Sequence, residues 1–209
     1  TSLPAVEALA APGQPRELRK AAVVALAGFG ELASVDLLRQ AAADEYVGLR
    51  LAALAELREM PGRDADAAFG EILPRFIGTS LEASFTHALE TRGAGLARRV
   101  YGRYLGDSNP MVVRRVAIHA GMLAEPASVP VLMRLLPQSP NDRDLLESLA
   151  HASCVDYRNM PDPAGVYEIW WRDHQGQDPS LWLVDGLEGR NFTLSENLIE
   201  GSGASRDTI

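Results

Sequence analysis

Apolar residues recur three and four positions apart through the first three quarters of the chain, a spacing typical of helices with one buried side. In the segment 46–58 this spacing links Val47, Leu51, Leu54 and Ala55. We expect these four residues to form the buried stripe of a helix, preceded by a shorter helix over 34–43 with Ser34 as its N-cap. No stretch combines sustained apolar–polar alternation with β-branched residues, so a sheet is not expected.

The helical pattern repeats along the chain. The run Leu-Arg-Lys-Ala-Ala at 18–22 returns as Leu-Arg-Leu-Ala-Ala at 49–53 and as Val-Arg-Arg-Val-Ala at 113–117, with degenerate copies at 81–85 and 145–149. Successive copies start 31 or 32 residues apart, long enough for two helices each. The sequence therefore predicts an all-α solenoid of about five helical hairpins over residues 1–155. Their approximate limits are 1–31, 32–62, 63–93, 94–124 and 125–155.

Two of these copies carry a motif that resembles the HEAT-repeat family. Asp44 precedes Leu49-Arg50, and Asp107 precedes Val113-Arg114, similar to the family's Asp in the inter-helix turn followed by Val-Arg in the second helix. The alanine-rich second helices look most like short, bacterial, lyase-associated HEAT repeats. This resemblance implies a right-handed α-α superhelix of the HEAT/armadillo type, in which second helices line the concave side.

The spacing of six or seven residues within this motif returns each arginine toward the preceding turn. We therefore expect a ladder in which Arg50 bonds to Asp44 and Arg114 bonds to Asp107, because guanidinium–carboxylate pairs are strong and directional.

The C-terminal part of the chain has a different composition. All three tryptophans, Trp170, Trp171 and Trp182, fall within residues 156–190. The last hairpin of a solenoid exposes an apolar end, and large aromatic side chains cover such an end efficiently. We expect 156–190 to be a terminal cap and the glycine- and serine-containing segment 191–209 to be a polar, flexible tail.

Three of the four histidines occupy one repeated position. His87, His119 and His151 are separated by 32 residues each, at the same place in successive second helices, where earlier repeats have Val24 and Ala55. We expect them to line the concave groove about 8–12 Å apart. Either they form a pH-sensitive strip that contacts a partner, or they are polar residues on a solvent-exposed surface that occupy matching positions because the repeats share ancestry. A single zinc site is disfavoured, because packed helices lie about 8–10 Å apart and Zn–N bonds are about 2 Å.

Two further groups could carry chemistry. Arg114 and Arg115 could hold an acidic peptide or a phosphate, although such arginines more often pair with inter-repeat carboxylates. Cys154 follows His151 by three residues, which permits a nucleophile–base pair. A structural cysteine is the favoured interpretation, because no third orienting group accompanies them.

Composition narrows the classes of partner. Hydrophobic residues make up 46% and charged residues 23%, as in ordinary soluble proteins. A net charge of −8 disfavours nucleic acid, whose phosphates need a cationic surface. The chain has no apolar run of about 18 residues, so no membrane-spanning helix is predicted. A single cysteine leaves the compartment open: a cytoplasmic location is favoured, with a mature secreted or periplasmic form, or a fragment of a longer protein, as alternatives.

These observations favour a non-catalytic scaffold or adaptor, without cofactor or metal, whose groove binds another protein or peptide, alone or as one subunit of a larger assembly. The resemblance to lyase-associated repeats suggests an alternative, a HEAT-based lyase or chaperone-lyase holding a tetrapyrrole-like chromophore. A nucleic-acid-binding HEAT fold is the second alternative, and the net charge opposes it.

Overall fold

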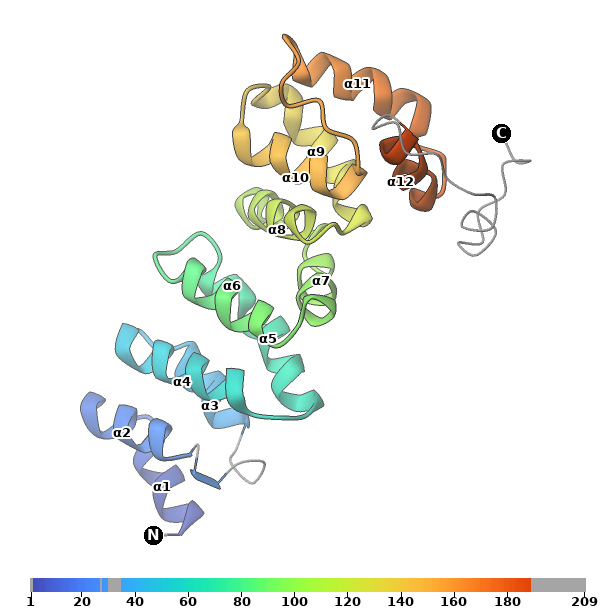
Figure 1. Ribbon diagram of the computed structural model, residues 1–209. Helices are drawn as coiled ribbons and strands as arrows, with labels where there is room; N and C mark the ends of the chain where they lie inside the picture. The colour runs from blue at the N-terminus through green and yellow to red at the C-terminus, as the bar shows by residue number, and fades with distance from the viewer. Residues whose placement is uncertain (1, 27, 30–34, 189–209) are drawn as a thin grey trace. The chain divides into compact units, whose positions relative to one another are not determined.

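The chain folds into helices joined by short turns (Figure 1). The computed structural model describes residues 2–26, 28–29 and 35–188, and within these ranges it contains twelve α-helices and no strand. This confirms the all-α class. The helices form two compact units, 1–100 and 101–209, and α7 (Ala94–Gly102) crosses the boundary between them. The predicted N-cap Ser34, the last two residues of the predicted cap and the tail 191–209 lie outside the described residues.

Unit 1 contains three successive helical pairs. They are α1 (Leu3–Ala10) with α2 (Arg16–Leu26), α3 (Val35–Ala42) with α4 (Val47–Glu59), and α5 (Arg63–Phe76) with α6 (Glu82–Thr91). The second helix of each pair packs on the second helix of the next, so that α4 lies between α2 and α6. The first helices pack in the same order, with α3 between α1 and α5. Unit 1 is thus two parallel rows of helices.

One arginine joins two of these pairs. Arg92, directly after α6, donates from Nε to Asp66 of α5 at 3.0 Å. Its Nη1 donates to the carbonyls of Leu57 and Arg58 at 2.9 Å each. Those carbonyls belong to the last turn of α4, where helical carbonyl groups lack partners within the helix and attract cations. The guanidinium therefore ties the end of the second pair to the third.

Unit 2 is less regular, because 3₁₀ turns interrupt its helices. Its α-helices are α8 (Pro110–Met122), α9 (Val129–Leu135), α10 (Arg143–Ser153), α11 (Pro163–His174) and α12 (Pro179–Glu188), with 3₁₀ turns η2 (Pro126–Ser128) and η3 (Leu136–Gln138) on either side of α9. Side-chain caps start three of them: Asn109 accepts from the Met111 N–H at 3.0 Å, Asp142 from the Leu145 N–H at 3.0 Å, and Asp162 from the Gly165 N–H at 3.1 Å. Helix α10 ends at Cys154, whose φ of 64° is left-handed.

Helices α8 and α10 approach each other closely at a glycine. A Cβ on Gly121 would lie 2.7 Å from the Cβ of Ser148, so a larger residue there would push the helices apart. The Ser148 hydroxyl donates across this contact to the Ile118 carbonyl at 3.1 Å. This contact fixes the spacing of the two second helices in unit 2.

The C-terminal helices cover one side of α9 and α10. Trp170 and Trp182 are 5% and 3% exposed and belong to the same core cluster as Leu146 and Leu149, while Trp171 packs against it half-buried. The Trp170 and Trp182 rings meet edge to face, 5.5 Å apart. All three tryptophans therefore contribute to the packing of α11 and α12 on the last pair.

The predicted buried stripe of α4 is wrong in three of its four positions. Leu54 is buried, whereas Val47 is 47% exposed, Leu51 is 37% exposed and Ala55 is exposed. The side that faces the core instead carries Leu49, Ala52, Ala53, Leu54 and Leu57. Apolar residues occupy more than one side of this helix, so their spacing alone does not distinguish the buried side. The consequence is an apolar surface exposed on α4.

Candidate functional site: the exposed faces of the second helices

The second helices of unit 1 present the same side to solvent. Leu26, Leu57 and Leu89, at one equivalent position of α2, α4 and α6, are each 0% exposed. Because equivalent residues point inward, the three helices have the same rotation about their axes, and equivalent residues on the outer side form rows. We define the second-helix face by two such positions, four residues apart. In unit 1 these are Lys20 and Val24 on α2, Leu51 and Ala55 on α4, and Ala83 and His87 on α6.

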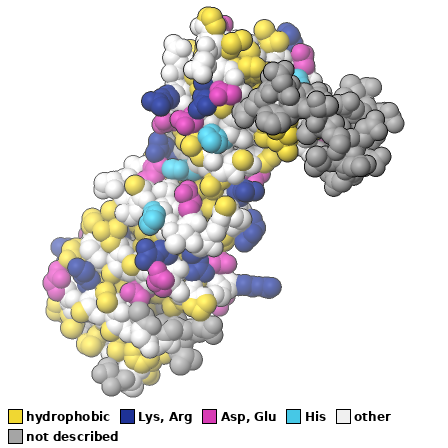
Figure 2. Space-filling view, in the orientation of Figure 1, with side chains coloured by type: hydrophobic (Ala, Val, Ile, Leu, Met, Phe, Trp, Pro, Cys, Tyr) yellow, Lys and Arg dark blue, Asp and Glu magenta, His cyan; other side chains and the backbone are white. Residues whose placement is uncertain are grey.

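This face of unit 1 is mostly uncharged. Val24 is 49% exposed and Leu51 is 37% exposed, and the two lie on packed helices. Of the six residues only Lys20 carries a formal charge, and it is half-buried. Figure 2 shows apolar side chains on the visible surface of unit 1, in the lower part of the view. Exposed apolar residues on neighbouring elements are suited to contact with another molecule.

The same two positions in unit 2 are polar. They hold Arg115 and His119 on α8, and Glu147 and His151 on α10, which packs against α8. His151 is exposed, whereas His119 is half-buried with its ring stacked on that of Tyr101, the centroids 5.4 Å apart and the planes at 20°. The second-helix face is thus mostly apolar in unit 1 and polar in unit 2, because the repeats carry different residues at the same two positions.

The three repeated histidines are distributed over both units. His119 and His151 lie on neighbouring helices of unit 2, whereas His87 belongs to unit 1, where it is exposed. The expected continuous column of all three stays a prediction. Among the described residues, no group of three or more His, Cys, Asp or Glu side chains is gathered closely enough to hold a metal ion. None of the described helices is long and apolar enough to cross a membrane.

The predicted ladder of Arg50 with Asp44 and Arg114 with Asp107 is wrong in its direction. Asp44 accepts from Nη1 of Arg19 at 2.7 Å, an arginine of the preceding pair. Arg114 likewise reaches forward to Asp142. Asp107 accepts instead from the backbone N–H of Asn109 at 2.7 Å.

The physical reason is that each arginine side chain runs from one second helix toward the inter-helix turn of the next pair. In two places that turn offers an aspartate that also caps the following helix or turn: Asp142 accepts from Leu145, and Asp44 accepts from the Tyr46 N–H at 2.8 Å. Burial opposes ionisation of Asp142, but the Leu145 N–H and Arg114 outweigh it, and its pKa lies below the ordinary value. The Tyr46 N–H, followed by Arg19, lowers the pKa of Asp44.

Arg50 has no aspartate in the next turn and takes other partners. Its Nη2 donates to the Arg75 carbonyl, and its guanidinium lies 4.6 Å from the centre of the Phe76 ring. Burial lowers the pKa of Arg50. Arg50 and Arg114 thus both have partners within the fold. Because Arg114 is paired with Asp142, it is a structural residue here rather than an open binding group. Arg115, its neighbour, lies half-buried on the second-helix face.

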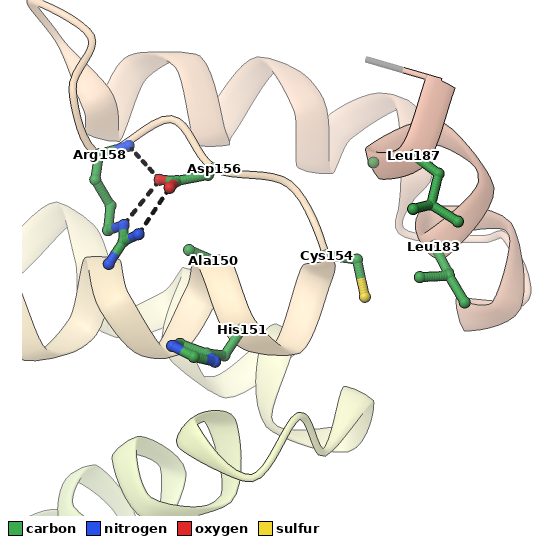
Figure 3. A pocket seen from close by; sticks show the side chains of 8 residues that line it. Ala150, His151, Cys154, Asp156, Arg158, Leu183 and Leu187 are labelled. Carbon is green, nitrogen blue, oxygen red and sulfur yellow. Dashed lines mark hydrogen bonds and ion pairs between the residues drawn. The ribbon is translucent and has the colours of Figure 1, made fainter. Parts of the chain in front are cut away.

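A cavity of about 320 Å³ lies where α12 meets the end of α10, and sequence reasoning did not identify it. His151 and Cys154 line it together with Leu183, Gly186 and Leu187 of α12 (Figure 3). The His151 ring and the Cys154 thiol point to different sides, which does not support a nucleophile–base pair (Figure 3).

On the other side of this cavity, Arg158 is held by Asp156. Its Nε and Nη2 donate to the two carboxylate oxygens at 2.8 and 2.7 Å, and a further contact reaches Glu147 at 3.7 Å. The Asp156 hydrogen bonds raise the pKa of Arg158 most; burial opposes them, and the charges of Asp156 and Glu147 raise the pKa further. The guanidinium at this cavity is thus already neutralised by carboxylates of the same chain.

Comparison with known proteins assigns the chain to no family. No protein-family model matches it, and neither a curated protein sequence nor a solved structure is found to be similar to it.

Proposed function

We propose that this chain is a non-catalytic, HEAT-type scaffold or adaptor that binds another protein or peptide along the second-helix face. In the arrangement that the repeats predict, this face lines the concave side of the solenoid. The partner is a polypeptide segment that places apolar side chains on unit 1. The chain can act alone or as one subunit of a larger assembly.

The observation that carries this proposal is the exposed apolar surface of α2 and α4. Val24 and Leu51 occupy the second-helix face, and Val47 adds a 47%-exposed side chain one turn before Leu51. The side chains of Ala55 and Ala83 are small and exposed, so a partner can approach the surface closely between the larger residues. The centres of protein interfaces are depleted in charge in the same way. Burial of this surface by a partner would contribute roughly 25 cal/mol per Å².

The polar part of the face in unit 2 supports the same function. Arg115, His119, Glu147 and His151 make this part of the face polar in unit 2, where His151 is the exposed one of the four. Such a surface supplies orientation and specificity more than affinity.

The test compares two leucines that are exposed to the same extent. Leu51 on the second-helix face is 37% exposed, and Leu9 on the first helix α1 is 38% exposed. Each is changed separately to glutamate, and each tagged variant is used to capture partners from a lysate of the source organism, quantified by mass spectrometry. We expect Leu51→Glu to lose the proteins that the wild type retains, at least about tenfold, because a buried unpaired charge in an interface is costly. Leu9→Glu is expected to retain them.

Equal retention by both variants would refute the second-helix face as the binding surface. Circular dichroism of both variants establishes that the helices are intact, so that loss of a partner cannot be assigned to unfolding.

A further inference from the structure

The cavity at the end of α10 has walls of two kinds. On one side stand Leu183 and Leu187 of α12, with the Cys154 side chain across from them (Figure 3). On the other side stand Asp156 and Arg158, from the segment that follows α10. Leu183 is exposed, and Leu187 and Cys154 are half-buried. The apolar wall of the cavity can therefore be reached from solvent.

The lining of this cavity carries no net charge when His151 is neutral. Arg158 donates to both carboxylate oxygens of Asp156, so the two formal charges of the lining cancel. Glu147 lies 3.7 Å from Arg158 but is not among the residues that line the cavity. A charged group that entered would lose its water without meeting an unpaired charge of opposite sign, which is costly. The cavity therefore suits an uncharged, largely apolar group.

Close packing of the backbone holds the walls of the cavity in place. Cys154 ends α10 with a left-handed φ of 64°, and a Cβ on Gly186 would lie 2.1 Å from its carbonyl oxygen. Trp182, 3% exposed, fixes α12 in the core cluster that also contains Leu149 of α10. A pocket that exists before its ligand arrives costs less to fill, because its walls need not be ordered on binding.

The size of the cavity limits what it can take. Its volume of about 320 Å³ lies at the lower end of the range of roughly 300–1,000 Å³ for pockets that bind small molecules. It therefore matches a group of the size of one large side chain rather than a longer segment of polypeptide.

The cavity borders the second-helix face of unit 2. His151 of α10 belongs to that face and also lines the cavity. The face itself is polar here, and polar contacts contribute specificity more than affinity. Protein interfaces gain most of their binding energy from a few large side chains in well-packed pockets. The cavity is a place beside this polar surface where such a side chain can be buried.

We infer that this cavity is an anchor pocket, which takes one uncharged, apolar side chain of the polypeptide that binds the second-helix face. The side chain lies between the leucines of α12 and the Arg158–Asp156 pair. This inference rests on the proposed function and specifies what the partner carries where it meets unit 2.

The first arm of the test uses Cys154, the only cysteine of the chain, as an attachment point in the pocket. The full chain is equilibrated with disulfides of cysteamine amides in graded 2-mercaptoethanol, and the mixed disulfide is quantified by intact mass spectrometry. Three probes share one linker and end in a phenyl, a carboxyphenyl or an aminomethylphenyl group. Exchange of each probe with glutathione gives its intrinsic preference for a thiol.

We expect the phenyl probe on the wild type to withstand about tenfold more reductant than either charged probe, after this correction, because its ring is buried. The matched variants are Leu183→Ser and Ile169→Ser, at apolar positions of the cap helices that are 49% and 56% exposed. Leu183→Ser should reduce the preference to less than about threefold, and Ile169→Ser should keep it. A wild type without the preference, which needs no variant to measure, or a Leu183→Ser variant that keeps it, would overturn the pocket.

The second arm asks whether the pocket serves the partner polypeptide. The tagged chain with the phenyl probe on Cys154 is compared with a chain that carries only a methyl disulfide there, too small to fill the pocket. We expect the phenyl-blocked chain to retain at least about fivefold less of the lysate proteins that the wild type captures and Leu51→Glu loses. The methyl-capped chain should retain them, and removal of the phenyl probe with dithiothreitol should restore them.

The outcomes separate this inference from the proposed function. Full retention of these proteins by the phenyl-blocked chain refutes the anchor pocket and leaves the second-helix face as the binding surface. Equal retention by the wild type and Leu51→Glu refutes the proposed function, and the anchor role falls with it even where the phenyl probe is preferred.

Discussion

One arginine position near the start of the second helices decides how neighbouring pairs are joined. Where the next inter-helix turn has an aspartate, as for Arg19 and Asp44, the two form an ion pair between pairs of helices. Where it has none, Arg50 uses a backbone carbonyl and an aromatic ring. The three copies that have this arginine thus differ in its acceptor, and the other two copies have Glu82 and Leu146 in its place.

The Asp44 carboxylate should stabilise unit 1 in a pH-dependent manner. Its pKa is lowered in the folded state, so its stabilisation is present above the ordinary value of 3.8 and is lost as pH falls through the folded pKa. We expect Asp44→Asn to lower the free energy of unfolding by about 1 kcal/mol at pH 7. The difference from wild type should shrink as pH falls below about 4. Urea denaturation at several pH values measures both.

The control for this variant is Glu45→Gln, an exposed neighbour in the same turn. It should change stability little at any pH. If the effect of Asp44→Asn did not depend on pH, the pairing with Arg19 would not be its cause.

The arginine contacts illustrate what sequence could not determine at this scale. Asp44 lies six residues before Arg50 and 25 after Arg19, and both separations allow an ion pair. Which one forms depends on the direction of the side chain between packed helices, and this direction is set by tertiary structure. The signal that was available was an aspartate at a similar, though not equal, separation from Arg114, since Asp142 follows it by 28 residues.

At the scale of elements, helices were more predictable than their buried sides. Helices expected over 34–43 and 46–58 correspond to α3 and α4, which span Val35–Ala42 and Val47–Glu59. The buried stripe of α4 was not predictable, because Leu49 and Leu51 point to opposite environments two residues apart. The cavity at Cys154 was also not predictable, since it exists only because α12 returns to the end of α10.

The cap helices should contribute to the stability of unit 2 through the buried indoles. Trp170 is 5% exposed, whereas its neighbour Ile169 is 56% exposed. We expect Trp170→Ala to lower the free energy of unfolding by about 3 kcal/mol, as large-to-small changes in cores do. Ile169→Ala should stay within about 0.5 kcal/mol of wild type. Urea unfolding followed by circular dichroism compares the two, and equal effects would show that α11 is not part of the core.

At the scale of the whole molecule, repetition places equivalent residues in rows, and substitution within the rows sets their chemistry. The second-helix face is apolar where the repeats have Val24 and Leu51 and polar where they have Arg115 and Glu147. A buried core explains the repeated leucines Leu26, Leu57 and Leu89 inside unit 1, but it does not explain apolar residues on the outside. Under the proposed function, a bound polypeptide covers them.

The most direct test of this account is site-specific photo-crosslinking in cells of the source organism. A photoreactive benzoylphenylalanine replaces either Ala55, exposed on the second-helix face of α4, or Ala67, exposed on the first helix α5. We expect a discrete, higher-mass adduct with another polypeptide from position 55 and none from position 67. An adduct from position 67 alone, equal adducts from both positions, or no adduct from position 55 would contradict it.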